Sequence, residues 1–97
     1  VDSGMHSKRW SREQATEYFI ATTGIARGRS QNEIDRYTVW PGQACSYKIG
    51  HTVWERLREE AKAAQGERFD LRRFHEVLRL GAMPLTTLEK VVRARFA

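Results

Sequence analysis

Pro41 is the residue that most constrains how this chain can fold. A proline ring clashes with the preceding helical turn and removes a backbone N–H, so an α-helix does not run through it. Helix-forming sequence lies on both sides of Pro41, and proline is well tolerated at the first position of a helix. The sequence therefore predicts a break at Val39–Trp40 and a long helix from about Pro41 to Gln65, ended by Gly66.

Capping boxes, in which Ser or Thr is followed three residues later by Glu or Gln, predict three further helix starts. They are Ser11 with Gln14, Ser30 with Glu33, and Thr86 with Glu89. The first helix would end at Gly24, and the glycine-containing segment 24–30 would be a loop. The second would run to about Thr38. Another helix would be capped by Asp70 and ended by Gly81. No strand-period segment of useful length is present, so we expect an all-α fold of about five helices in a single domain over residues 1–97.

The long helix carries two stripes of side chains. One is aliphatic and predicts a core seam of Cys45, Ile49, Val53, Leu57, Ala61 and Ala64. The other mixes polar groups with aromatic rings and contains Gln43, Tyr47, Gly50, His51 and Trp54. Glycine inside a helix costs roughly 1 kcal/mol relative to alanine. Gly50 therefore predicts a close approach by a neighbouring helix or a ligand.

The chain is basic, with a formal net charge of +5 and a pI of about 9.9. Acidic residues are interspersed among the basic ones, which predicts a mixed solvated surface, so we expect nucleic acid not to be the ligand. No apolar run is long enough to span a bilayer, and we expect no membrane partner. The lone Cys45 excludes an internal disulfide and is expected to be a buried helical thiol. Compartment, periplasmic or cytoplasmic, stays open.

The histidines do not predict a metal site in this chain. His51 and Glu55 are one helical turn apart, but two ligands are too few for a protein zinc site. His75 is expected on the surface. His6 lies near the end of a probable first helix, where an imidazolium interacts favourably with the helix dipole.

Residues 36–50, "RYTVWPGQACSYKIG", are the strongest candidate for a functional segment. Tyr47 could donate a hydrogen bond to a developing oxyanion, and Arg36 could bind a carboxylate with two hydrogen bonds. The alternative is structural: Tyr37, Trp40 and Tyr47 would pack the corner where two helices meet, with Arg36 paired to an acid.

This segment also carries a family resemblance. "YTVWPGQACSYKIG", with "VDSGMHSKRWSREQATEYF" before it and "GERFDLRRFHEVLRLGAMPLTTLEKVV" after it, resembles the C-terminal end of a bacterial family catalogued as domain of unknown function 885. Members of that family are longer, largely helical proteins that look like zinc metallopeptidases of the H-E-x-x-H type. The resemblance implies that this chain, whose start at Val1 looks cut into, is a C-terminal helical subdomain. The zinc ligands of the parent would lie upstream, so the chain alone is expected to hold no cofactor and to be inactive.

The resemblance also implies roles for individual residues. Tyr47 would stabilise the tetrahedral intermediate of peptide hydrolysis. The residues expected to contact a peptide-like substrate are Arg36, Tyr37, Gln43, Lys48 and His6. The expected partners are the remainder of the parent chain and, through exposed apolar surface, a second copy. Two alternatives stay open: a basic helical module that binds an acidic partner or nucleic acid, and a purely structural helical subdomain.

Overall fold

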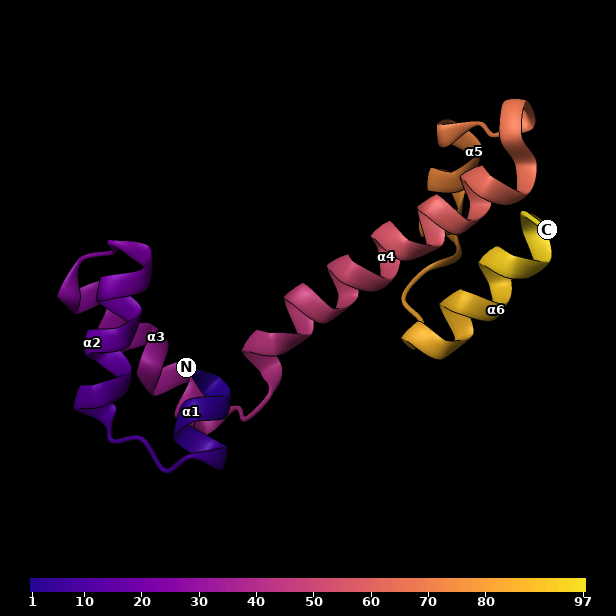
Figure 1. Ribbon diagram of the computed structural model, residues 1–97. Helices are drawn as coiled ribbons and strands as arrows, with labels where there is room; N and C mark the ends of the chain where they lie inside the picture. The colour runs from indigo at the N-terminus through magenta and orange to yellow at the C-terminus, as the bar shows by residue number, and fades with distance from the viewer. The chain divides into compact units, whose positions relative to one another are not determined.

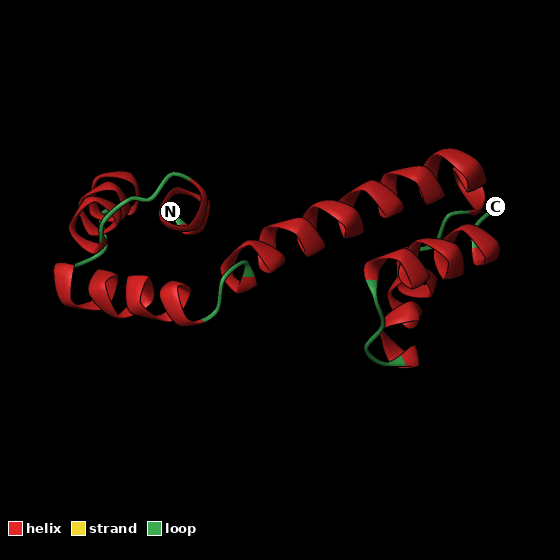
Figure 2. Ribbon diagram, turned by 90° about the horizontal axis from the view of Figure 1, so that it is seen from below, coloured by secondary structure: helices red, strands yellow, loops and turns green.

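The computed structural model describes residues 1–97 and contains helices, turns and loops but no strand (Figures 1 and 2). The helical elements in chain order are α1 (Asp2–Ser7), α2 (Arg12–Thr23), α3 (Arg27–Val39), α4 (Gln43–Gln65), the 3₁₀ segment η1 (Gly66–Arg68), α5 (Leu71–His75), the 3₁₀ segment η2 (Glu76–Leu80) and α6 (Leu85–Arg95). The all-α prediction is confirmed, with six α-helices where about five were expected. None of these helices combines the length and the apolar character needed to cross a membrane.

The chain divides into two compact units, Val1–Tyr47 and Lys48–Ala97. Helices α1 to α3 and the first turn of α4 belong to the first unit. The rest of α4 and all later elements belong to the second. The single domain expected over residues 1–97 stays a prediction.

Helix α2 begins and ends as the sequence predicts. The Ser11 hydroxyl accepts the Gln14 backbone N–H at 3.1 Å, and the Gln14 side-chain oxygen accepts the Ser11 N–H at 2.9 Å. These two bonds form a complete capping box. Gly24 ends the helix in the left-handed conformation, with φ +72°, which glycine adopts without steric cost.

Helix α3 begins earlier than predicted. It starts at Arg27, so the connecting loop is shorter than the predicted segment 24–30. Ser30 is no cap: it is fully buried inside the helix, and its hydroxyl donates to the carbonyl oxygens of Ile25 at 3.1 Å and Ala26 at 2.9 Å. A serine within a helix satisfies its hydroxyl on the preceding turn in this way. The S-x-x-E match at Ser30 therefore does not mark a helix start.

Helices α2 and α3 lie side by side in the first unit (Figure 1). Three of the four buried side chains in these helices, those of Ala15, Thr16 and Ser30, are small, and Ile34 is the large one. The Arg12 guanidinium donates to both carboxylate oxygens of Asp35, at 2.7 and 3.1 Å. Small residues allow the two helix backbones to approach closely, so this unit has a tight core with few large apolar side chains.

The predicted break around Pro41 is present, with a shifted boundary. α3 ends at Val39, and α4 begins at Gln43 rather than Pro41. Gly42 has φ +80°, a left-handed conformation that lies outside the helix, so Pro41 belongs to the turn. The predicted end of α4 at Gln65 is confirmed.

The core of the second unit forms between α4, α5, η2 and α6. Its buried residues are Leu57, Ala61, Phe74, Val77, Leu88, Val92 and Phe96. Aromatic rings dominate it: Phe74 lies 5.8 Å from Phe96 and 5.7 Å from Trp54, ring centre to ring centre. Edge-to-face pairs at such distances add about 0.5–1.5 kcal/mol beyond their burial.

The predicted aliphatic seam of α4 is only partly buried. Leu57 and Ala61 are in the core and Val53 packs against it, but Ile49 is 55% exposed and Ala64 is also exposed. The half-buried Cys45 is free, and it is less buried than expected. No helix of this chain approaches Gly50 closely, because a Cβ built there would meet nothing within 4 Å, so that alternative is wrong, and the approach of a ligand stays a prediction.

The helix ends of the second unit follow the sequence less closely. The Asp70 carboxylate accepts the Arg72 N–H at 3.0 Å, which confirms the predicted cap. The helix after it tightens into the 3₁₀ segment η2 before Gly81 ends it at φ +94°. α6 begins at Leu85, directly after Pro84 and without a side-chain cap, so the predicted capping box at Thr86 is wrong. Proline presets the backbone at a helix start.

Candidate functional site

The corner between α3 and α4 brings three of the predicted site residues together. The Arg36 guanidinium donates to the side-chain oxygen of Gln43, and the Gln43 amide donates to the Tyr47 phenol oxygen at 3.2 Å. Gln43 and Tyr47 are one helical turn apart on α4, a spacing at which side chains are neighbours. The corner therefore holds a continuous chain of hydrogen bonds that ends on a phenol.

Arg36 is itself held in place from α3. Its second terminal nitrogen donates to the Glu33 carboxylate at 2.8 Å, and its guanidinium carbon lies 5.0 Å from the centre of the Tyr37 ring. The hydrogen bond from Arg36 keeps the pKa of the Glu33 carboxyl below its usual range. Burial raises the pKa of the Tyr37 phenol. Each terminal nitrogen of Arg36 therefore has one partner within this chain, Gln43 for one and Glu33 for the other.

Tyr47 is not a core residue. Its side chain is 66% exposed, and its hydroxyl accepts one hydrogen bond, from Gln43. The phenol proton is thus free to be donated outward. Trp40 and Val39 are also exposed, and with Arg36 they line an open hollow of about 330 Å³.

Lys48 does not share the face of Gln43 and Tyr47. It follows Tyr47 directly on α4, and successive helical residues do not face each other. Its side chain is exposed, and Lys48 opens the second unit.

His6 is paired with a residue that the sequence analysis missed. The His6 Nδ1 atom lies 2.9 Å from the Asp2 carboxylate and 2.9 Å from the Asp2 backbone oxygen. The hydrogen bond to that backbone oxygen, together with the carboxylate, raises the pKa of His6 against the opposing effect of burial. The available signal was an aspartate four residues before a histidine, the spacing of helical neighbours.

Asp2 also contacts the corner. Its carboxylate is 7% exposed and accepts the backbone N–H of Gly42 at 2.9 Å, and the Cys45 sulfur lies 3.9 Å away. Asp2 and Tyr37 both line a hollow of about 280 Å³ within the first unit. Cys45 also lines that hollow, whereas His6, Arg36, Gln43 and Tyr47 are not among its lining residues.

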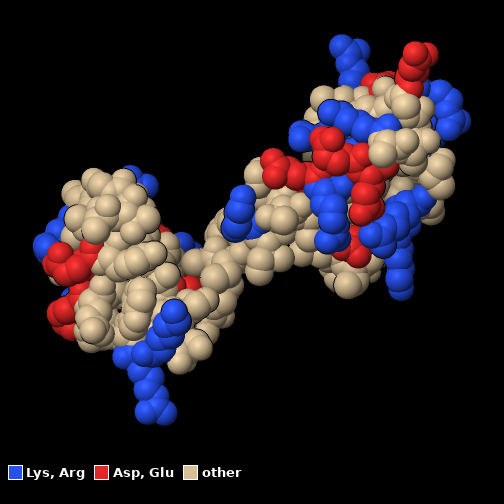
Figure 3. Space-filling view, viewed as in Figure 1, with Lys and Arg blue, Asp and Glu red and all other residues tan.

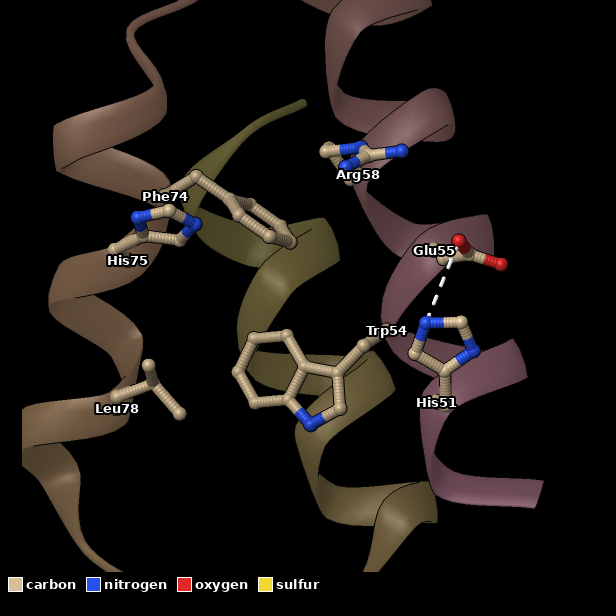
Figure 4. A pocket seen from close by; sticks show the side chains of 7 residues that line it. All are labelled: His51, Trp54, Glu55, Arg58, Phe74, His75 and Leu78. Carbon is tan, nitrogen blue, oxygen red and sulfur yellow. Dashed lines mark ion pairs between the residues drawn. The ribbon is translucent and has the colours of Figure 1, made fainter. Parts of the chain in front are cut away.

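A separate hollow of about 360 Å³ lies in the second unit (Figure 4). Trp54, Phe74 and Leu78 supply apolar walls, while His51, Glu55, Arg58 and His75 supply polar groups. His51 and Glu55 are 3.5 Å apart and exposed. No three His, Cys, Asp or Glu side chains are grouped closely enough to bind a metal ion here or elsewhere in the chain.

Basic and acidic side chains are mixed over the surface. Figure 3 shows lysine and arginine beside aspartate and glutamate across the second unit. There Arg56 pairs with Glu89, and Arg93 lies 3.4 Å from Glu60, so ion pairs join α4 to α6. This distribution agrees with the mixed surface that the sequence predicts.

Helices paired around a proline–glycine corner, with a hydrogen-bonded arginine, glutamine and tyrosine, define an all-α protein segment. Residues 1–92 match the family described as "Bacterial protein of unknown function (DUF885)", and the chain belongs to that family. No curated protein matches the chain.

One solved structure is similar over almost the whole chain. It is "The crystal structure of the putative lipoprotein from Colwellia psychrerythraea", with 47% sequence identity and a TM-score of 0.94. The match covers 98% of this chain and 16% of that one. The chain therefore spans less than a fifth of the length of that relative.

Proposed function

We propose that this chain is a C-terminal helical segment of a longer zinc-peptidase-like protein and that its α3–α4 corner forms one wall of the substrate cleft. The observation that carries the proposal is the chain of hydrogen bonds from Arg36 through Gln43 to the exposed Tyr47 phenol. Hydrogen bonds that end on an exposed phenol hold that phenol in place as a hydrogen-bond donor. A tyrosine that served only to fill the core would have its ring buried.

The chemistry expected of Tyr47 is hydrogen-bond donation to an oxyanion. Gln43 fixes the phenol oxygen by donating to it, which leaves the phenol O–H to donate to substrate. A donor that meets its acceptor only in the transition state raises turnover more than it strengthens substrate binding. A peptide carbonyl that becomes tetrahedral during hydrolysis is such an acceptor.

Zinc does not fit this chain on its own. A zinc site needs three or four closely grouped ligands, and no such group exists among residues 1–97. In the proposed function, zinc would be bound by residues outside this chain, and no residue here is assigned as a ligand.

A structural corner is the second candidate. It is favoured by the two partners of Arg36, Glu33 and Gln43, which are both groups of this chain. On that reading the hydrogen bonds only fix the angle between α3 and α4. A basic binding module is less well supported, because many of the basic side chains are paired with acids.

Tyr47→Phe in the longer natural protein separates the two leading readings. Peptide hydrolysis would be measured over a panel of short peptides, first with the wild-type protein. We expect the turnover number to fall by roughly a hundredfold, corresponding to about 3 kcal/mol, with little change in KM. Tyr18→Phe is a matched control, since Tyr18 is another exposed tyrosine of the first unit.

The structural reading predicts a different result. Tyr47→Phe would then leave turnover intact and lower stability by about 1 kcal/mol through one lost hydrogen bond. An unchanged turnover number, with wild-type activity established, would refute the cleft-wall proposal.

A further inference from the structure

We propose that Asp2 is a positioning residue that couples His6 to the α3–α4 corner, so that one buried carboxylate holds both the His6 imidazole and the start of the helix that carries Tyr47. As an imidazolium, His6 then donates a hydrogen bond from Nε2 to a carbonyl or carboxylate oxygen of the peptide-like substrate. The role of His6 rests on the proposed function, whereas the coupling through Asp2 does not.

The geometry of Asp2 carries the coupling. A carboxylate that is only 7% exposed is costly to bury unless its oxygens accept hydrogen bonds. Here one oxygen faces His6 Nδ1 at 2.9 Å and the other accepts the Gly42 N–H at 2.9 Å. These partners are separated by 36 residues along the chain, so Asp2 joins two distant segments through a single group.

The contact with His6 fixes the orientation of the imidazole. A carboxylate on one ring nitrogen selects the ring's tautomer and raises its basicity, which leaves the opposite nitrogen as the functional edge. Asp2 is the charged group that acts on His6, and from α3 the backbone carbonyl of Thr38 also favours the imidazolium. The Cys45 thiol faces Asp2 from α4. The His6 side chain is 33% exposed, so it reaches solvent.

The contact with Gly42 fixes the start of α4. Gly42 has φ +80° and directly precedes Gln43, the first residue of that helix. Its N–H could not be satisfied within α4, and the Asp2 carboxylate accepts it. A shift of the carboxylate therefore displaces the first turn, where Gln43 contacts Tyr47.

The experiment is an NMR titration of the 97-residue chain and its Asp2→Asn variant. We expect the pKa of the His6 imidazole to lie above its ordinary value in the wild-type chain and to move toward that value in Asp2→Asn. His51 and His75 lie in the second unit, and their ring signals serve as internal controls for the effect of the substitution. The Gly42 amide shift should titrate with the same midpoint as His6 in the wild-type chain, a readout that needs no variant.

Peptide hydrolysis by the longer protein tests the proposed role of His6 toward the substrate. We expect Asp2→Asn to lower kcat/KM by about 10- to 100-fold. Asp2→Asn should add little in a His6→Gln background, because residues that act as a unit are not additive. Asp2→Glu, which keeps the charge, should restore part of the loss.

Different results would overturn the coupling through Asp2, the cleft-wall proposal and the substrate role of His6. A Gly42 amide that does not follow His6 in the wild-type chain would overturn the coupling, whatever the activity. A normal turnover number in Tyr47→Phe would refute the cleft wall and leave the coupling standing. Intact kcat/KM in His6→Gln, with Tyr47→Phe impaired, would overturn the substrate role of His6 alone.

Discussion

Gly4 lies against the indole ring of Trp10, so closely that a Cβ at Gly4 would be 2.5 Å from the Trp10 Cε3 atom. Gly4 is buried in α1, and Trp10 is itself held beside Tyr18, with ring centres 5.1 Å apart. The indole cannot shift without disturbing that pair. We therefore expect Gly4→Ala to lower the free energy of unfolding by about 1–3 kcal/mol, the typical cost of overpacking.

Gly50→Ala is the matched control for Gly4→Ala. Gly50 lies within α4 and a Cβ there would meet nothing within 4 Å. Alanine in place of glycine inside a helix stabilises by roughly 0.5–1 kcal/mol. Chemical denaturation followed by circular dichroism should give opposite signs for the two variants. Equal effects would contradict the close contact between Gly4 and Trp10.

Ser11 and Ser30 both match the capping-box pattern, with Gln14 and Glu33 respectively, but they occupy different structural positions. Ser11 caps α2, whereas the buried Ser30 hydroxyl donates to carbonyls that are already part of the α3 start. Ser11→Ala should cost about 1 kcal/mol. Ser30→Ala should change stability by less than that, because the Ala26 carbonyl still accepts the residue 30 N–H. Denaturation curves of the two variants test this, and a larger loss at Ser30 would refute it.

The two serines also show which features of the fold can be predicted from the sequence. A capping box is local, so the pattern at Ser11 predicts α2 correctly, whereas Ser30 lies buried inside α3 and does not mark its start. The cap at Asp70 was predictable because a single polar side chain makes it. The break around Pro41 was predictable because the proline ring cannot continue a helix. The neighbouring helix expected at Gly50 is absent from this chain, because helix packing is not visible in one sequence.

Some contacts of the candidate site can likewise be predicted from the sequence, and others cannot. Gln43 and Tyr47 are one helical turn apart, so the sequence alone predicts that their side chains lie on one face. The sequence leaves two partners open for Arg36, a substrate carboxylate or an acid of this chain, and in the structure Arg36 lies beside Glu33 and Gln43. Asp2 was missed, because its contact with Gly42 joins residues 40 positions apart and only the folded chain brings them together.

Exposed apolar side chains predict that the chain associates with itself. The large exposed hydrophobic residues include Val39, Trp40, Ile49, Leu71, Leu78 and Leu80. Leu78 is 62% exposed beside the Trp54 hollow, and exposed apolar surface favours association. Light scattering should show an average mass that rises with concentration, and Leu78→Lys should reduce that rise.

Thr52→Lys is the control for Leu78→Lys, because it adds the same charge at an exposed polar position of α4. It should leave association nearly unchanged apart from general charge repulsion. A wild-type chain that stays monomeric at every concentration would contradict the prediction.

The Glu33–Arg36 pair predicts how stability depends on pH. The hydrogen bond from Arg36 lowers the pKa of Glu33 below its ordinary value of 4.5. A group whose pKa is lowered by folding stabilises the folded state above its unfolded pKa and loses that effect as pH falls through its folded pKa. We expect wild type to be more stable than Glu33→Gln above about pH 5, and the difference to shrink below pH 4.5. With side chains 34% and 37% exposed, the pair should contribute only about 0.2–1 kcal/mol.

Arg36→Gln provides the control for that prediction, because it removes the hydrogen bond that lowers the pKa of Glu33. In the Arg36→Gln background, adding Glu33→Gln should lower the free energy of unfolding by less near neutral pH than it does in the wild-type background. The effect of Glu33→Gln should also depend less on pH. Urea denaturation of the four proteins at pH values from about 3 to 7 measures this, with the coupling energy taken from the double-mutant cycle. A coupling energy of zero at neutral pH would mean that Glu33 does not hold Arg36, and the orientation of Gln43 toward Tyr47 would then depend on Arg36 alone.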